Sequence, residues 1–176
     1  MEGNEKTLSK SSLLGEDILM ILVTLGTQKQ QFCRLLDYIE KSEIKDRILV
    51  QAGHTKYVSK KMEVFDFINY EKMEQLIDEA DVVITHGGTG SIITPLKKGK
   101  RVIVCARKKE YGEHVDNHQT EIVEVLREEG YILELNECNK IDELMKEITY
   151  FKPKEYQENT DKFIEELKKE IGKYLL

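Results

Sequence analysis

The chain has 176 residues, of which 40% are hydrophobic and 34% charged, the composition of a globular domain with a sizeable core. Its net charge of −6 excludes the broad basic surface that nucleic-acid-binding domains usually carry, so no nucleic-acid partner is expected. No stretch approaches the ~20 apolar residues of a membrane span, and the three cysteines form no CxxC pair, so neither a membrane helix nor a zinc site is expected.

The two ends of the chain differ from its middle. Residues 1–17 are polar and lack the apolar centre of a signal peptide, so we expect a flexible extension. Residues 18–152 are expected to form one domain. Residues 153–176 are expected to form an amphipathic helix, with an apolar stripe suited to dock on this domain or on a partner, made of Phe163, Ile164, Leu167, Ile171 and Leu175.

Short apolar runs alternate with segments of helical periodicity along residues 18–152. The runs that predict strands are 18–24, 47–52, 63–68, 82–85, 101–106 and 131–135. The segments that predict helices are 30–41, 70–79, 89–98, 117–129 and 141–148. This alternation predicts an α/β fold, a Rossmann-like, doubly wound parallel sheet of about six strands. Ligands of such sheets bind beyond the carboxyl ends of the strands.

A glycine-rich turn joins the strand at 82–85 to the helix at 89–98. It consists of His86, Gly87, Gly88, Thr89, Gly90 and Ser91. A helix start offers unpaired N–H groups and the positive end of the helix dipole, and glycines let the backbone approach an anion closely. The turn therefore predicts a diphosphate site, with the hydroxyls of Thr89 and Ser91 as further donors or as helix caps. The alternative interpretation is a tight turn that serves packing only.

The turn matches neither G-x-G-x-x-G nor the P-loop, so it indicates neither NAD binding nor ATP hydrolysis. Gly26 and Thr27, after the first strand, belong to the same predicted edge and are expected to add donors to the site. His54, after the second strand, is either a proton acceptor or an inert loop residue.

The loop after the fifth predicted strand, residues 107–119, is rich in functional groups. Arg107 is expected to neutralise phosphate, and the amides of Asn117 and Gln119 are expected to bind sugar hydroxyls. His114 and His118 lie in the same loop. The alternative is a solvated loop in which Asn117 or Asp116 caps the next helix.

Three motifs together resemble a known family. They are the segment from Val23 to Thr27, the segment from Ala80 to Ser91, and the Gly-Glu-His-Val-Asp-Asn-His-Gln run of residues 112–119. They resemble the donor-binding, C-terminal half of GT-B glycosyltransferases, the group that includes MurG. The resemblance is closer to subunits that consist of this half alone, such as the small subunit of the dolichol-linked N-acetylglucosamine transferase. The run at 112–119 most resembles the bacterial PssE-like subunits of exopolysaccharide and capsule assembly.

The resemblance implies roles for individual residues. The turn from His86 to Ser91 is expected to face the diphosphate of UDP, and Phe67 and Ile68 to hold the uracil. The segment Asn117, His118 and Gln119 is expected to contact the donor sugar and its phosphates. Thr94 occupies a position where many relatives have a glutamate that binds the ribose hydroxyls, and a threonine cannot accept two hydrogen bonds as a carboxylate does.

The resemblance implies a UDP-sugar-binding catalytic subunit of a two-component, inverting glycosyltransferase. Such an enzyme transfers galactose or N-acetylglucosamine to a lipid-linked sugar. A membrane-anchored partner supplies the acceptor half and recruits this cytoplasmic chain to the inner face of the membrane. No cofactor and no metal are expected, because N–H groups and a helix dipole hold the leaving UDP.

The general base is a separate question. Its candidates within this chain are His86, His114 and His54, and the partner could supply it instead. A second interpretation is a non-catalytic nucleotide-sugar-binding subunit that activates its partner.

Overall fold

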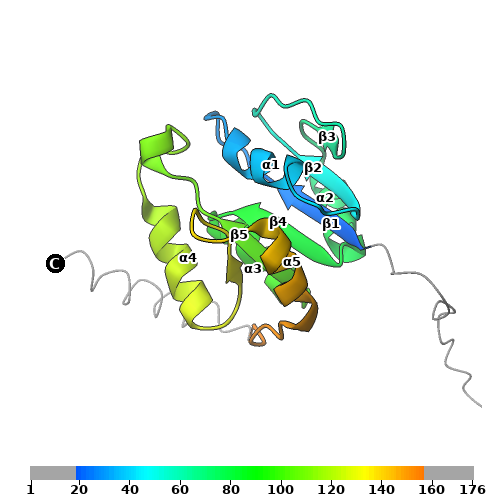
Figure 1. Ribbon diagram of the computed structural model, residues 1–176, viewed down its shortest axis with the longest axis vertical. Helices are drawn as coiled ribbons and strands as arrows, with labels where there is room; N and C mark the ends of the chain where they lie inside the picture. Colours follow the sequence, from blue (N-terminus) through cyan, green and yellow to red (C-terminus); the bar gives the residue numbers. More distant parts are fainter. Residues whose placement is uncertain (1–18, 157–176) are drawn as a thin grey trace, which may run out of the picture.

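Six parallel strands pair side by side in the order β3-β2-β1-β4-β5-β6 (Figure 1). The computed structural model describes residues 19–156. The strands are β1 (Met20–Thr24), β2 (Arg47–Gln51), β3 (Glu63–Phe65), β4 (Val82–His86), β5 (Arg101–Cys105) and β6 (Leu133–Glu134). The helices are α1 (Cys33–Glu40), α2 (Tyr70–Glu79), α3 (Thr89–Lys97), α4 (His118–Glu128) and α5 (Ile141–Tyr150), with a short 3-10 helix η1 (Lys109–Tyr111). The predicted Rossmann-like, doubly wound fold is confirmed.

Helices cover both faces of the sheet because side chains alternate along each buried strand. In β1, Ile21 and Val23 pack in the cluster that holds α1 and α5, whereas Leu22 packs with α2. In β5, Ile103 faces the α1 and α5 side, and Val102 packs with α3 and α4 on the other. The continuous apolar runs seen in the sequence are therefore strands buried on both sides.

The edge strands are shorter than the sequence predicts. The run at 63–68 forms strand only at Glu63–Phe65, and the run at 131–135 only at Leu133–Glu134. β3 and β6 each have one neighbouring strand; β3 ends opposite Gln51, the last residue of β2, and β6 pairs only with Ile103 and Val104 of β5. The inner strand β4 extends one residue further than predicted, because His86 pairs with Cys105 of β5.

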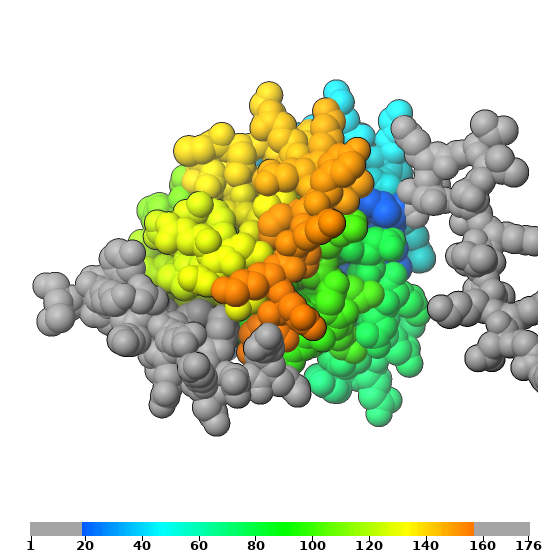
Figure 2. Space-filling view, turned by 90° about the horizontal axis from the view of Figure 1, so that it is seen from below, coloured from blue at the N-terminus to red at the C-terminus, as the bar shows by residue number. Residues whose placement is uncertain are grey.

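The last described segment, residues 151–156, follows α5 without forming a helix. It runs across the face seen in Figure 2 as an orange band between the yellow and green parts of the chain. Lys154 N–H donates to Gly130 O at 3.0 Å, and the Tyr156 ring lies edge-on to Tyr131. The rest of the predicted C-terminal helix and the extension expected at 1–17 lie outside the described residues.

The chain reverses its direction of winding between β1 and β4. β1 has β2 on one side and β4 on the other. Helix α1, which follows β1, and helix α3, which follows β4, cover opposite faces of the sheet. In doubly wound sheets this switch point opens a crevice at the carboxyl ends of the strands. The glycine turn after β4 and the loop after β1 both lie there.

Candidate functional site: a pocket at the switch point

A pocket of about 390 Å³ opens between α2 and α3 at the carboxyl edge of the sheet. Seven of its lining residues were expected from the sequence: Gly26, Thr27, Phe67, Ile68, Gly90, Ser91 and Thr94. They come from the loops after β1 and β3 and from the first turns of α3. The structure thus brings together three segments that are far apart in the sequence.

The other lining residues were missed by sequence reasoning. They are Thr24, Gln51, Tyr70, Met73, Glu74, Ile77, Val83 and Pro95. The spacing of Met73 and Ile77 predicts the packing face of a helix. The local sequence does not distinguish a helix face that packs on the core from one that lines a pocket. Gln51 carried a usable signal, because a long polar side chain in a buried apolar strand is uncommon. Its amide donates to Gly26 O at 3.3 Å and to Asp66 O at 3.1 Å, joining the two loops that flank the pocket.

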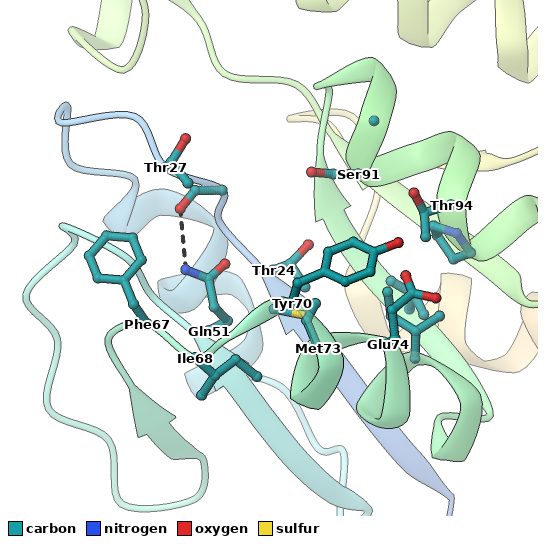
Figure 3. A pocket seen from close by; sticks show the side chains of 15 residues that line it. Thr24, Thr27, Gln51, Phe67, Ile68, Tyr70, Met73, Glu74, Ser91 and Thr94 are labelled. Carbon is teal, nitrogen blue, oxygen red and sulfur yellow. Dashed lines mark hydrogen bonds between the residues drawn. The ribbon is translucent and has the colours of Figure 1, made fainter.

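The pocket has one aromatic side and one polar side, as Figure 3 shows. Phe67 and Ile68 lie on one side, Ser91 and Thr94 lie opposite, and Tyr70 projects between them. The side chains of Phe67 and Tyr70 are 50% and 76% exposed, so two aromatic rings stand uncovered at the entrance. Aromatic faces beside hydrogen-bonding groups suit a planar base attached to a polar sugar phosphate.

His86 is buried beneath the glycine turn, and both of its ring nitrogens are engaged. Gly88 N–H donates to Nδ1 at 3.0 Å, which assigns the ring proton to Nε2, 3.0 Å from Ser91 Oγ. Burial, with a contribution from the Arg107 charge, lowers the pKa of His86 to about 4. Because neither nitrogen is available to an acceptor hydroxyl, the expected role of His86 as general base does not fit this arrangement. His86 instead orders the turn.

The buried state of His86 makes stability depend on pH. The unfolded chain protonates this histidine near pH 6.5 and the folded chain only near a pKa of about 4, so the unfolded state binds more protons between these values. The contribution of His86 to the free energy of unfolding is therefore complete above pH 6.5. It is lost as the pH falls toward 4, by up to roughly 3 kcal/mol.

The check is urea unfolding of the wild type and of His86→Asn at about pH 7.5 and about pH 4.5. Asn offers an oxygen to the Gly88 N–H but cannot be protonated, so the variant should lose less stability on acidification than the wild type. Equal losses in the two chains would contradict the assignment.

Three of the expected phosphate-binding glycines are required for close packing. A Cβ on Gly26 or Gly88 would come within 2.4 or 2.2 Å of the His86 ring, and a Cβ on Gly87 within 2.7 Å of Gln119. Gly26 also has a φ of +74°, which side chains rarely adopt. Only Gly90, of the glycines in the turn from His86 to Ser91, has open space where a side chain would lie. The bare backbone expected along the whole turn is thus confined to the start of α3.

The predicted helix caps are also corrected. The N-cap of α3 is Gly88, and no side chain accepts a capping hydrogen bond there. Thr89 is exposed, and Ser91 Oγ is committed to His86. The first N–H groups of α3 therefore have no side-chain cap among the described residues, which leaves them for a ligand.

Arg107 does not reach the pocket. Its side chain is 1% exposed, and its guanidinium donates to the backbone oxygens of Leu25, Gln30 and Glu113. The guanidinium is therefore turned to backbone oxygens of neighbouring loops and not to the pocket where a phosphate contact was expected.

The remaining expected residues are not among those that line the pocket. Asn117 Oδ1 accepts from Lys109 N–H at 2.9 Å, and Gln119 Oε1 accepts from Arg107 N–H at 3.2 Å. His118 Nδ1 is 3.2 Å from Glu121. His114 Nδ1 is 3.0 Å from Asp116 Oδ1, and the ring of His54 lies edge-on to Phe67 at 5.0 Å. The two other base candidates, His114 and His54, thus lie outside the pocket lining, and His54 contacts it through Phe67.

Within residues 19–156, no group of three or more His, Cys, Asp or Glu side chains is arranged to hold a metal ion. Over the same range no helix is both long and apolar enough to cross a bilayer.

Known proteins match both the sequence and the fold. The "UDP-N-acetylglucosamine transferase subunit ALG13" of Saccharomyces cerevisiae is 40% identical over 73 residues, 41% of this chain and 34% of the yeast protein. The chain thus spans about a third of the length of this relative.

Two solved structures share the fold. The NMR solution structure of ALG13 aligns with 85% of this chain and 95% of that chain, at 22% identity and a TM-score of 0.58. The crystal structure of Acinetobacter baumannii MurG aligns with 78% of this chain and 42% of that chain, at 17% identity and a TM-score of 0.50. Residues 20–174, most of the chain, match the family described as "Glycosyltransferase family 28 C-terminal domain". The protein therefore belongs to this glycosyltransferase family and carries its C-terminal domain.

Proposed function

We propose that this chain is the UDP-sugar-binding catalytic subunit of a two-component, inverting glycosyltransferase. One observation carries the proposal: a single pocket joins an aromatic wall to the uncapped start of α3 at Gly90. A uracil fits against Phe67 and Ile68, and a diphosphate fits at the helix start, where N–H groups and the dipole favour negative charge. Family membership supports the same assignment.

The proposed chemistry is direct displacement at the anomeric carbon. The acceptor hydroxyl attacks as a base takes its proton, and UDP leaves with its charge held by the first N–H groups of α3 and no metal. His114 and His54 are the candidates for the base in this chain, and the partner is the alternative source.

The relatives support the proposal of a second subunit. The yeast relative is named as a transferase subunit. We propose a membrane-anchored partner that binds a lipid-linked sugar acceptor and recruits this cytoplasmic chain to the inner face of the membrane. The run from Gly112 to Gln119 favours a role in bacterial exopolysaccharide or capsule assembly, with galactose or N-acetylglucosamine as the donor sugar.

The first test is binding. UDP at about 100 times its dissociation constant should raise the free energy of unfolding by about 2.7 kcal/mol, seen as a rise in Tm of roughly 5–10 °C. CDP and inorganic diphosphate at the same concentration serve as controls for base and phosphate. No shift with millimolar UDP, UDP-galactose or UDP-N-acetylglucosamine would refute the proposal.

The second test separates catalysis from activation. The chain is co-expressed with a candidate membrane partner, and transfer from each labelled UDP-sugar to lipid-linked acceptor is measured. Variants His54→Ala and His114→Ala then report the base. Full transfer by the double variant would place the base on the partner and favour the non-catalytic, activating role for this chain.

A further inference from the structure

Arg107, the second residue after β5, is among the largest fully buried side chains of the described chain. Its Nη1 donates to Gln30 O at 2.9 Å and to Glu113 O at 3.1 Å, and its Nη2 donates to Leu25 O at 2.8 Å. Leu25 and Gln30 bracket the loop that contains Gly26 and Thr27, which line the pocket. One side chain therefore fixes the loop after β1 against the loop after β5.

Among residues 19–156 no carboxylate forms an ion pair with Arg107, although the charge of nearby Glu113 acts on it. Within the same residues its buried Nε has no hydrogen-bond partner. The nearby Glu113 carboxylate is occupied by Arg34, at 2.9 and 2.8 Å, and by the N–H of Lys108. Burial lowers the pKa of Arg107 to about 10, so the group remains charged at neutral pH. Arg34 also pairs with Glu137, at 3.5 Å, and Glu137 pairs with Lys108 at 2.8 Å. This cluster therefore holds three positive charges, on Arg34, Arg107 and Lys108, and two negative charges, on Glu113 and Glu137.

The guanidinium of Arg107 lies 2.8 Å from Leu25 O, and Leu25 directly precedes Gly26, which lines the pocket. The charge of Arg107 contributes to the lowered pKa of His86, whose ring contacts Gly88 and Ser91 of the turn. A buried charge is screened by salt far less than a surface lysine. On a chain with a net charge of −6, such a charge beneath the site attracts an anion locally.

We propose that Arg107 is a positioning residue that holds the loop from Leu25 to Gln30 and supplies the positive potential by which the site selects a phosphorylated nucleoside. The proposal rests on the proposed function, because it names what favours the diphosphate of the same ligand. It separates two tasks: the pocket wall recognises the nucleoside, and the buried guanidinium favours its phosphates from below.

The test compares UDP with uridine, which lacks the phosphates. In Arg107→Gln the affinity for UDP should fall at least tenfold, while that for uridine falls less than threefold. In Arg107→Lys the charge remains but the geometry of the three carbonyl bonds is lost, so UDP and uridine should weaken by the same factor. Calorimetry for UDP and NMR titration for uridine give the ratio, and circular dichroism confirms folding. An equal loss for both ligands in Arg107→Gln would show a purely structural role and overturn the proposal.

A second variant keeps Arg107 in place. Glu113→Gln removes one of the two negative charges of the cluster, so UDP should bind several-fold tighter while uridine is unchanged. Weaker or unchanged UDP binding would overturn the proposal even if Arg107→Gln fails to fold. UDP binding by the wild type is measured before any variant is made. A wild type that does not bind UDP would refute the proposed function itself, separately from the role of Arg107.

Discussion

A Gly90→Val chain is expected to fold normally and to lose UDP binding by at least about 100-fold, or ~2.7 kcal/mol. Gly90 lines the pocket, and a Cβ there meets no atom within 4 Å, so the new side chain projects into space that a ligand needs rather than into the core. Valine is slightly more favourable than glycine inside a helix, by a few tenths of a kcal/mol, so the free energy of unfolding should not fall. Calorimetry with UDP and a circular dichroism melt measure the two effects separately.

Gly88→Ala is the matched control in the same turn. Its Cβ would lie 2.2 Å from His86 Cε1, so the turn or the ring must move. Overpacking of this kind costs about 1–3 kcal/mol of stability, and a fall in Tm is expected. If Gly90→Val kept its affinity for UDP, the start of α3 would not be the diphosphate site, and the turn would serve packing alone.

Replacing Glu74 is expected to remove the preference of this protein for ribose over deoxyribose. Glu74 is the acidic residue among those lining the pocket, and it lies on the Thr94 side in Figure 3. Its Oε2 accepts from Lys98 Nζ at 2.9 Å, and Lys98 follows Thr94 by one helical turn on the same face. A carboxylate from α2 thus stands beside the position where the family resemblance implies a glutamate on α3.

A charge-assisted hydrogen bond contributes about 1.5–3 kcal/mol, so the wild type should bind UDP at least about tenfold tighter than 2′-deoxy-UDP. In Glu74→Gln the two affinities should agree within about twofold. Folding should be little affected, because Lys98 keeps Asp78 at 2.8 Å. Glu71→Gln, on the same helix but outside the pocket lining, is the control and should keep the wild-type ratio. An unchanged ratio in Glu74→Gln would mean that another group binds the ribose.

The fold was predicted from the periodicity of the apolar residues and from the positions of the glycines. The apolar run at 82–85 and the amphipathic segment at 70–79 were assigned correctly because strand and helix periods are local properties of the chain. The helix at Tyr70–Glu79 matches its predicted bounds, since Asn69 caps it through its own side chain. The edge strands were predicted too long, because only the residues that pair with the neighbouring strand form strand, and pairing is not a local property of the chain.

The candidate site was predicted in part, and the division has a physical cause. The turn before α3 was visible because glycines clustered at a strand end are a local signal. The hydrogen-bond partners of Arg107 and His86 could not be predicted from the sequence. For Arg107, the carbonyl oxygens of Leu25 and Gln30 lie some 80 residues away in the sequence. The local sequence around a basic residue in a polar loop does not show whether its side chain faces a phosphate or a backbone carbonyl.

What the amino-acid sequence determined by itself is the order of strands and helices and the parallel sheet, because each follows from short-range periodicity and chain connectivity. Only the tertiary structure decided which glycine is open, that Glu74 reaches the pocket, and that Arg107 is buried as an unpaired charge. Those properties depend on which segments become neighbours in space, and the strand order that brings β1 beside β4 is what makes them neighbours.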